Sequence, residues 1–163
     1  MTATGVRLKL VRERLQAMAE QIDALRALPQ RTKEEFLADR RNPDAAESNL
    51  RRALEALFDV ARHLLSKGHG LGALEYKEVA RLSGEKGLVA DADLVQCFSE
   101  IAGFRNRLTH YYHEVTPEEI YAVVAEDIPD LEAIGEELRQ AGARLGEDAD
   151  ESDGSPHGAA RPD

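Results

Sequence analysis

The sequence predicts an all-α protein, an up-and-down bundle of about five helices. Apolar residues recur every three or four positions along most of the 163-residue chain, which is the spacing of one helix face. No segment shows sustained alternation of apolar and polar residues, so no strand is expected. Aromatic residues make up only 5% and tryptophan is absent, so the core must be built from leucine, alanine, valine and isoleucine. This composition favours helices.

The first helix is expected over about residues 6–28. Its buried stripe follows i, i+4, i+7, i+11 and i+14 and consists of Val11, Leu15, Met18, Ile22 and Leu25. Pro29 stops it, because proline has no N–H for the helical hydrogen bond. Thr32 is placed to cap a short helix that contains Phe36 and Leu37.

A second long helix opens at Pro43 and Asp44 and ends at Gly68 in the sequence GHGLG. Its stripe consists of Ala46, Leu50, Ala53, Leu57, Ala61 and Leu64. The glycine cluster predicts a turn. Its spacing does not match a phosphate-binding loop and no strand precedes it, which argues against a nucleotide site there.

The second half of the chain predicts three further helices. One spans about residues 75–84, and the turn GEKGLVAD leads to another that starts near Asp91. The sequence from Thr116 to Glu119, TPEE, is a capping box with proline at the first helical position, and it opens the last helix. Pro129 should kink or divide that helix.

The net charge of −10 is unevenly distributed. Residues 146–163 carry six acidic residues and one arginine, which is half of the net charge, and they have almost nothing to bury. We therefore expect one helical domain over residues 1–145 and a disordered acidic tail over 146–163. The domain is mildly acidic, which argues against electrostatic binding of nucleic acid over a broad surface, so any contact with nucleic acid must be local.

The N-terminal segment has no long apolar run and no cleavage-site pattern, so we expect a soluble cytoplasmic protein with no membrane partner. The single Cys97 cannot form an internal disulfide and is interpreted as a buried structural thiol. His63 and His69 are interpreted as surface or hydrogen-bonded structural residues.

Polar chemistry is concentrated in the stretch GFRNRLTHYYHEV, residues 103–115, within a helical pattern. If the fifth helix continues through it, Arg105 and Tyr112 fall on the apolar stripe. A guanidinium facing a dry core is costly unless it is paired. The stripe is therefore expected to open there onto a cleft or a partner surface; alternatively, the arginine extends from the edge of the stripe to water.

A second polar strip would be formed by Asn106, His110 and His113, rotated about 100° from Arg105. Arg105 and His110 would point about 140° apart on a straight helix. They could still meet one reacting group if the arginine reaches round, if the helix loosens near Tyr111, or if a two-fold axis brings two copies together. A symmetric dimer would place two arginines and two histidines around one groove.

These residue types suit cleavage of an RNA phosphodiester. A base takes the proton of the 2′-OH, an acid protonates the departing 5′-oxygen, and a fixed cation stabilises the charge on phosphorus. His110 can act as base or acid and Arg105 can supply the charge, with no metal or cofactor required. His110, His113 and Glu114 could instead suggest a metal site, but their spacing is not that of a zinc helix and a third clear ligand is missing.

The sequence RNRLTHYY, residues 105–112, resembles the Arg-x4-His-x-Tyr motif of HepT-like toxins, a branch of the HEPN superfamily of helical ribonucleases. The resemblance extends to the flanking segments and covers roughly residues 6–138. The similar segments are EEFLADRRNPDA, AAESNLRRALEALFDVARHLL, LEYKEVARLSGEKGLV and EVTPEEIY.

The resemblance implies a metal-independent endoribonuclease that acts as the toxin of a type VII-like toxin–antitoxin system. Arg105 and His110 would be the catalytic pair, with Asn106 supporting them. Tyr112 matches the tyrosine to which the antitoxin, a minimal nucleotidyltransferase, transfers AMP. The implied partners are a second copy of the chain, that antitoxin, and an RNA substrate, with tRNA and mRNA as candidates.

The resemblance also allows a non-enzymatic interpretation. A HEPN dimer could serve only as the binding partner or the substrate of a nucleotidyltransferase, because the same residues could hold a partner's phosphate. The sequence leaves both interpretations open.

Overall fold

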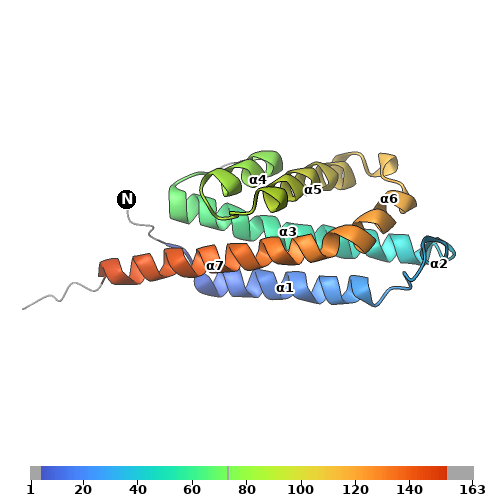
Figure 1. Cartoon of the computed structure of the whole chain (residues 1–163), viewed down its shortest axis with the longest axis horizontal. Coiled ribbons are helices and arrows are strands. Elements are labelled where there is room, and N and C mark those ends of the chain that lie inside the picture. The colour runs from blue at the N-terminus through green and yellow to red at the C-terminus, as the bar shows by residue number, and fades with distance from the viewer. Residues whose placement is uncertain (1–4, 73, 154–163) are drawn as a thin grey trace, which may run out of the picture.

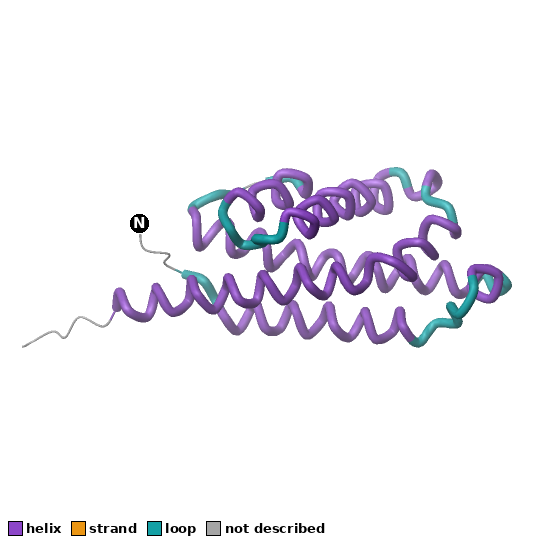
Figure 2. The backbone as a smooth tube through the Cα atoms, viewed as in Figure 1, coloured by secondary structure: helices purple, strands orange, loops and turns teal. Residues whose placement is uncertain are grey.

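The computed structural model describes residues 5–72 and 74–153, and these residues confirm the all-α prediction. Figure 2 shows helices joined by short loops, with no strand in this part of the chain. The α-helices are α1 (Leu8–Arg26), α2 (Lys33–Leu37), α3 (Arg41–His69), α4 (Tyr76–Glu85), α5 (Ala92–His110), α6 (Pro117–Ala122) and α7 (Ile128–Asp153).

The bundle is elongated, and α3 runs through its centre (Figure 1). Helices α1 and α7 lie along one side of α3, while α4 and α5 pair with each other and cover another side. The short helices α2 and α6 lie together at one end. Helix α3 contacts every other α-helix of the described chain.

The central position of α3 explains why it is buried on more than one face. The single stripe predicted for this helix is too narrow, because Leu54, Ala56, Phe58 and Val60 lie outside it and are also buried. A helix that is apolar on most sides belongs in the middle of a bundle.

Side-chain caps fix three of the predicted helix starts, whereas α3 starts at Arg41, two residues before the predicted Pro43, without a side-chain cap. The Thr32 hydroxyl accepts a hydrogen bond from the Glu35 N–H at 3.1 Å, and the Thr116 hydroxyl accepts one from the Glu119 N–H at 3.2 Å. A carboxylate oxygen of Asp91 accepts from the second and third N–H groups of α5. These caps satisfy N–H groups that the first helical turn leaves without partners.

The glycine turn after α3 is also present, two residues later than predicted. Helix α3 continues to His69, and Gly70 follows it with φ of 70°. Only glycine adopts this left-handed conformation without a steric cost, so Gly70 provides the helix stop.

Pro129 divides the last helix, as predicted. Helix α6 passes into a π-helical turn over Val123–Asp127, and α7 begins immediately afterwards. Proline cannot donate the hydrogen bond of a regular helix and its ring crowds the preceding turn. A wider turn just before it accommodates both effects.

The N-terminus of α1 is tied to α3 through His63. The Arg7 N–H donates a hydrogen bond to His63 Nε2 at 2.8 Å. Burial lowers the pKa of His63, which favours the neutral form that this bond requires. His63 is therefore a hydrogen-bonded structural residue.

The predicted boundary of the acidic tail requires a correction. Helix α7 runs to Asp153, so residues 146–153 continue the bundle's last helix. Neither proline nor glycine interrupts residues 147–153. Gly146 is buried, and α7 lies so close to α1 at this point that a Cβ on Gly146 would be 3.0 Å from the Leu8 side chain. Residues 154–163 lie outside the described part, and a disordered tail there remains a prediction.

Across the described helices, none combines the length and the apolar character needed to cross a membrane.

Candidate active site

Helix α5 ends at His110, two residues before the end of the predicted stripe. The Tyr111 N–H makes the last helical bond, to the Arg107 carbonyl at 2.9 Å, and a 3₁₀ turn follows over Tyr112–Glu114. Thr116 must be extended because it precedes proline, so the chain has to leave the helix within a few residues. The loosening near Tyr111 is thus the end of α5.

Arg105 lies inside the bundle, where only 12% of its side chain is exposed. Its Nε donates a hydrogen bond to Oε1 of Glu55 on α3 at 2.9 Å, and its Nη2 donates to the same oxygen. Its guanidinium carbon lies 3.9 Å from the centre of the Tyr76 ring on α4. The arginine therefore does not extend freely to water, because it pairs at the edge of the bundle with Glu55, whose side chain is 39% exposed.

Glu55 and Tyr76 are site residues that the sequence analysis missed. One signal for Glu55 is its setting in ALEALFDVA, where Leu54 and Ala56 on either side are both buried. A carboxylate in such a segment needs a partner nearby. No comparable signal marks Tyr76, the first residue of α4.

His110 lies at the exposed C-terminal end of α5. The hydrogen bonds and ion pairs of the described residues link Arg105 to Glu55 and do not link it to His110. His113 follows the end of the helix, so it does not continue the strip formed by Asn106 and His110 as the sequence suggested.

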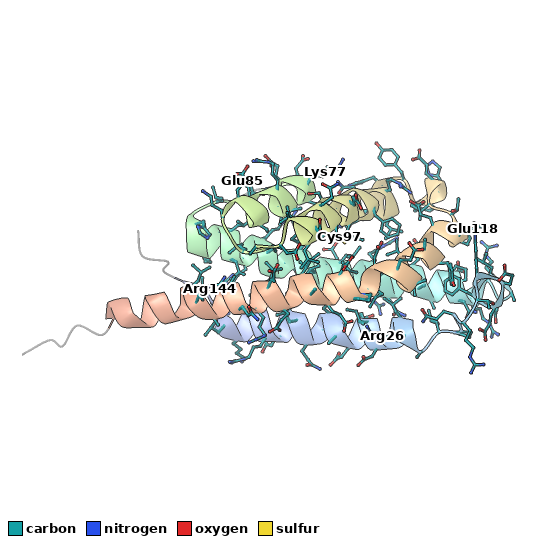
Figure 3. The ribbon with its side chains drawn as sticks, viewed as in Figure 1. Arg26, Lys77, Glu85, Cys97, Glu118 and Arg144 are labelled. Atoms are coloured by element: carbon teal, nitrogen blue, oxygen red, sulfur yellow. The ribbon has the colours of Figure 1, made fainter. Side chains whose placement is uncertain are left out.

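Asn106 lines a groove beside α5 with a volume of about 1270 Å³. Arg107 and Tyr111 line its end nearest to His110, and Lys77 and Glu85 stand on the outer side of α4 along it (Figure 3). Its apolar lining comes from Val89, Ala90, Ala92, Val95, Ile101, Phe104 and Val123.

Two further arginines hold the last turn of α5 in place. Arg51 of α3 donates a hydrogen bond from Nη2 to the Leu108 carbonyl at 3.0 Å. Arg107 pairs with Glu119 of α6, and this hydrogen bond raises the pKa of Arg107. The helix end that carries His110 is therefore fastened to both α3 and α6.

Tyr112 is among the most exposed large hydrophobic residues of the described chain, at 67%, and Tyr111 is 54% exposed. The Tyr112 ring meets His113 edge to face, with ring centres 5.9 Å apart. Tyr112 does not lie on the same helix side as Arg105, contrary to the sequence prediction, because α5 ends at His110. The exposure nevertheless leaves the Tyr112 side chain open to another molecule.

Cys97 is half-buried on α5 (Figure 3). Burial, together with the nearby carboxylates of Asp127 and Asp130, raises its pKa to about 11. Because the thiolate is the nucleophilic form, this thiol is suited to packing and not to covalent chemistry. The described residues contain no group of three or more His, Cys, Asp or Glu side chains that could hold a metal ion.

The chain is thus an α-helical bundle with an Arg-x4-His segment, residues 105–110, in the last turns of α5. The family model described as ribonuclease HepT-like matches residues 18–138, which include the whole of this segment. The chain therefore belongs to the HepT-like family of the HEPN superfamily, as its sequence resemblance predicts.

A solved structure shares the fold at a TM-score of 0.70 and 19% sequence identity, covering 79% of this chain and 97% of the other. It is described as "Crystal structure of the toxin-antitoxin with AMP-PNP". No curated protein matches the chain.

Proposed function

We propose that this protein is a metal-independent endoribonuclease and the toxin of a toxin–antitoxin pair. The observation that carries the proposal is the match of the ribonuclease HepT-like family across residues 18–138, which include Arg105 and His110. The solved structure with this fold contains a toxin and its antitoxin, which supports the same biological setting.

Arg105 and His110 supply the two requirements of cleavage by the RNA's own 2′-OH. The oxygen of that group attacks phosphorus and loses its proton, the bond to the 5′-oxygen breaks, and that oxygen takes up a proton. The products are a 2′,3′-cyclic phosphate and a 5′-OH. His110, exposed at the helix end, carries one proton transfer, while Arg105 stabilises the charge on phosphorus and Asn106 supports the pair.

A homodimer would complete the site, because one histidine cannot accept one proton and donate another at the same moment. Arg105 itself does not require a dimer face, because Glu55 of the same chain pairs with its charge. The groove beside α5 supports the dimer instead, because its apolar lining ends at Asn106, Arg107 and Tyr111. A second copy seated there brings a second His110 to the same end of the molecule.

Control by a minimal nucleotidyltransferase fits the position of Tyr112. Its exposed side chain lies two residues from His110, so AMP attached to its hydroxyl would add bulk and negative charge beside the site. The added phosphate would repel an RNA backbone and compete for nearby cations.

One observation favours the non-enzymatic alternative, in which the dimer only binds a nucleotidyltransferase or serves as its substrate. Glu55 already neutralises much of the charge of Arg105, which lowers the attraction of this arginine for a phosphate. Only a cleavage assay separates the two functions.

The assay compares wild type, His110→Ala and Arg105→Ala on RNA, with and without EDTA. We expect each substitution to lower the cleavage rate by about a hundredfold or more, because one removes proton transfer and the other charge stabilisation. EDTA should leave the wild type active, and the products should carry 2′,3′-cyclic phosphates.

His69→Ala is the matched control, since His69 is also exposed at a helix end, that of α3. It should cleave like wild type. Full activity of His110→Ala would overturn the mechanism, and so would loss of wild-type activity on adding EDTA. If the wild type does not cleave RNA at all, the non-enzymatic binding function is supported instead.

A further inference from the structure

Glu55, Tyr76 and Arg105 form a closed triangle of contacts from three helices. Glu55 accepts hydrogen bonds from Nε and Nη2 of Arg105, and the Tyr76 ring lies under the guanidinium at 3.9 Å. The Tyr76 hydroxyl lies 3.4 Å from each oxygen of the Glu55 carboxylate. Each side chain therefore restrains the other two.

The pairing uses only one edge of the guanidinium. Glu55 takes the edge formed by Nε and Nη2, through its single oxygen Oε1. The end edge, which includes Nη1, has no hydrogen-bond acceptor among the described residues. Because a guanidinium carries five donors in a rigid plane, fixing one edge also fixes the direction of the other.

Tyr76 is itself held in place. A second guanidinium, that of Arg62, lies over its ring at 4.1 Å, and Phe58 packs against it edge to face at 4.8 Å. Arg62 also donates a hydrogen bond to the Leu74 carbonyl at 3.0 Å, just before α4 begins. The ring is thus a fixed support and not a mobile surface side chain.

We propose that Glu55 and Tyr76 are positioning residues that present the Nη1 edge of Arg105 to the scissile phosphate. The proposal rests on the ribonuclease function proposed above. Neither residue touches the reacting atoms: Glu55 sets the direction of the guanidinium within its plane, and Tyr76 sets the plane itself.

The ion pair has opposite effects on binding and on catalysis. The Glu55 carboxylate weakens the attraction between Arg105 and a ground-state phosphate, since it offsets the positive charge. Its geometric hold keeps the donors aimed at the position where negative charge increases in the transition state. Removal of the charge should therefore improve substrate binding while it slows the chemical step.

The kinetic test compares Glu55→Gln, Tyr76→Leu and Tyr76→Phe in the full chain on the same RNA. For Glu55→Gln we expect kcat to fall about tenfold and KM to fall about threefold, a split that partial unfolding does not produce. Tyr76→Leu should lower kcat about as much as Glu55→Gln does. Tyr76→Phe keeps the aromatic ring and should retain most of the wild-type kcat.

Glu136→Gln is the matched control. Glu136 accepts a hydrogen bond from the Nε of Arg139 at 2.8 Å, but this pair is exposed on α7. Its kinetics should equal those of wild type. In an Arg105→Lys background, Glu55→Gln should cause no further loss of kcat; an additive loss would show that Glu55 acts elsewhere and would overturn the proposal.

NMR of the arginine side chains tests the clamp without any RNA and so separates its failure from failure of the ribonuclease function. The Arg105 Nε–H signal should be shifted and slow to exchange in wild type, and should move to the average arginine position in Glu55→Gln and Tyr76→Leu. An averaged signal in wild type would overturn the clamp. A restrained signal in a protein that does not cleave RNA would uphold the clamp and refute its catalytic purpose.

Discussion

Arg105 is a permanent cation that this protein keeps almost out of water. Such a charge is tolerated only when a counter-charge and hydrogen bonds replace its hydration, and Glu55 supplies both. The arrangement favours fixed geometry over a strong general attraction for phosphate. That choice suits a domain of negative net charge, which cannot hold RNA by a broad basic surface.

Tyr112 gives the first prediction about control. Tyr112→Phe keeps the ring and removes the oxygen that would receive AMP, so the variant should fold normally and remain active when a nucleotidyltransferase and ATP are present. Wild type should gain one or more AMP units by intact-mass analysis and lose cleavage activity. Peptide mapping should place the AMP on Tyr112.

Tyr111→Phe is the control for that experiment, since Tyr111 is the neighbouring exposed tyrosine. This variant should still be modified and silenced. The prediction fails if AMP is found on Tyr111 or Tyr121 instead of Tyr112, or if the nucleotidyltransferase still abolishes RNA cleavage by Tyr112→Phe. Either result would show that the antitoxin inhibits by covering the site.

The helix starts were the easiest elements to predict. A capping residue predicts a helix start because it lies next to the turn that it stabilises, and three helices have such a residue: Thr32, Asp91 and Thr116. The end of α5 was not predicted correctly, because no glycine or proline lies next to it. It follows from the extended conformation that Thr116 needs six residues later.

The candidate site was predictable only where it lies within one segment. The motif in α5 places Arg105, Asn106 and His110 in the chain, and the family resemblance assigns their roles. Glu55 and Tyr76 lie 50 and 29 positions before Arg105, so their contact with it depends on how α3, α4 and α5 pack. Periodicity within a helix carries no information on which neighbour it will face.

The packing of α4 against α5 depends on Gly84. A Cβ at this position would lie 2.9 Å from Cγ1 of Val95, closer than the two atoms can approach. Valine on a helix is stiff about χ1, so it cannot easily turn away. Gly84→Ala should therefore destabilise the protein by about 1–3 kcal/mol in urea unfolding.

Gly135→Ala provides the opposite result. Gly135 lies inside α7, where an added methyl group would only reach ordinary contact with Met18 and Leu15, at 3.5 and 3.6 Å. This variant should be as stable as wild type or gain up to about 1 kcal/mol, because alanine is the better helix former. Equal stability of the two variants would show that α4 and α5 separate to accept the methyl group.

At the scale of the whole molecule, a large groove of mixed apolar and polar lining lies beside α5 among the described residues, and the proposed dimer depends on it. The groove places Asn106 and Tyr111 at the same end as the exposed His110. A two-fold axis near this end would bring two histidines to one phosphate, as the proposed chemistry requires. A substitution that breaks the dimer should therefore also abolish RNA cleavage.

Light scattering should give wild type a mass twice the 18.0 kDa of one chain at micromolar concentration.

Gln96→Arg places a charge in the groove from an exposed position on α5. It should weaken the dimer at least tenfold and slow RNA cleavage by a similar factor. Gln16→Arg is the matched control on α1: both glutamines are exposed and donate to a glutamate four residues later, Gln96 to Glu100 and Gln16 to Glu20. It should stay dimeric and active. A monomeric wild type that cleaves RNA would contradict the composite site, and a Gln96→Arg protein that stays dimeric would place the interface on another face of the bundle.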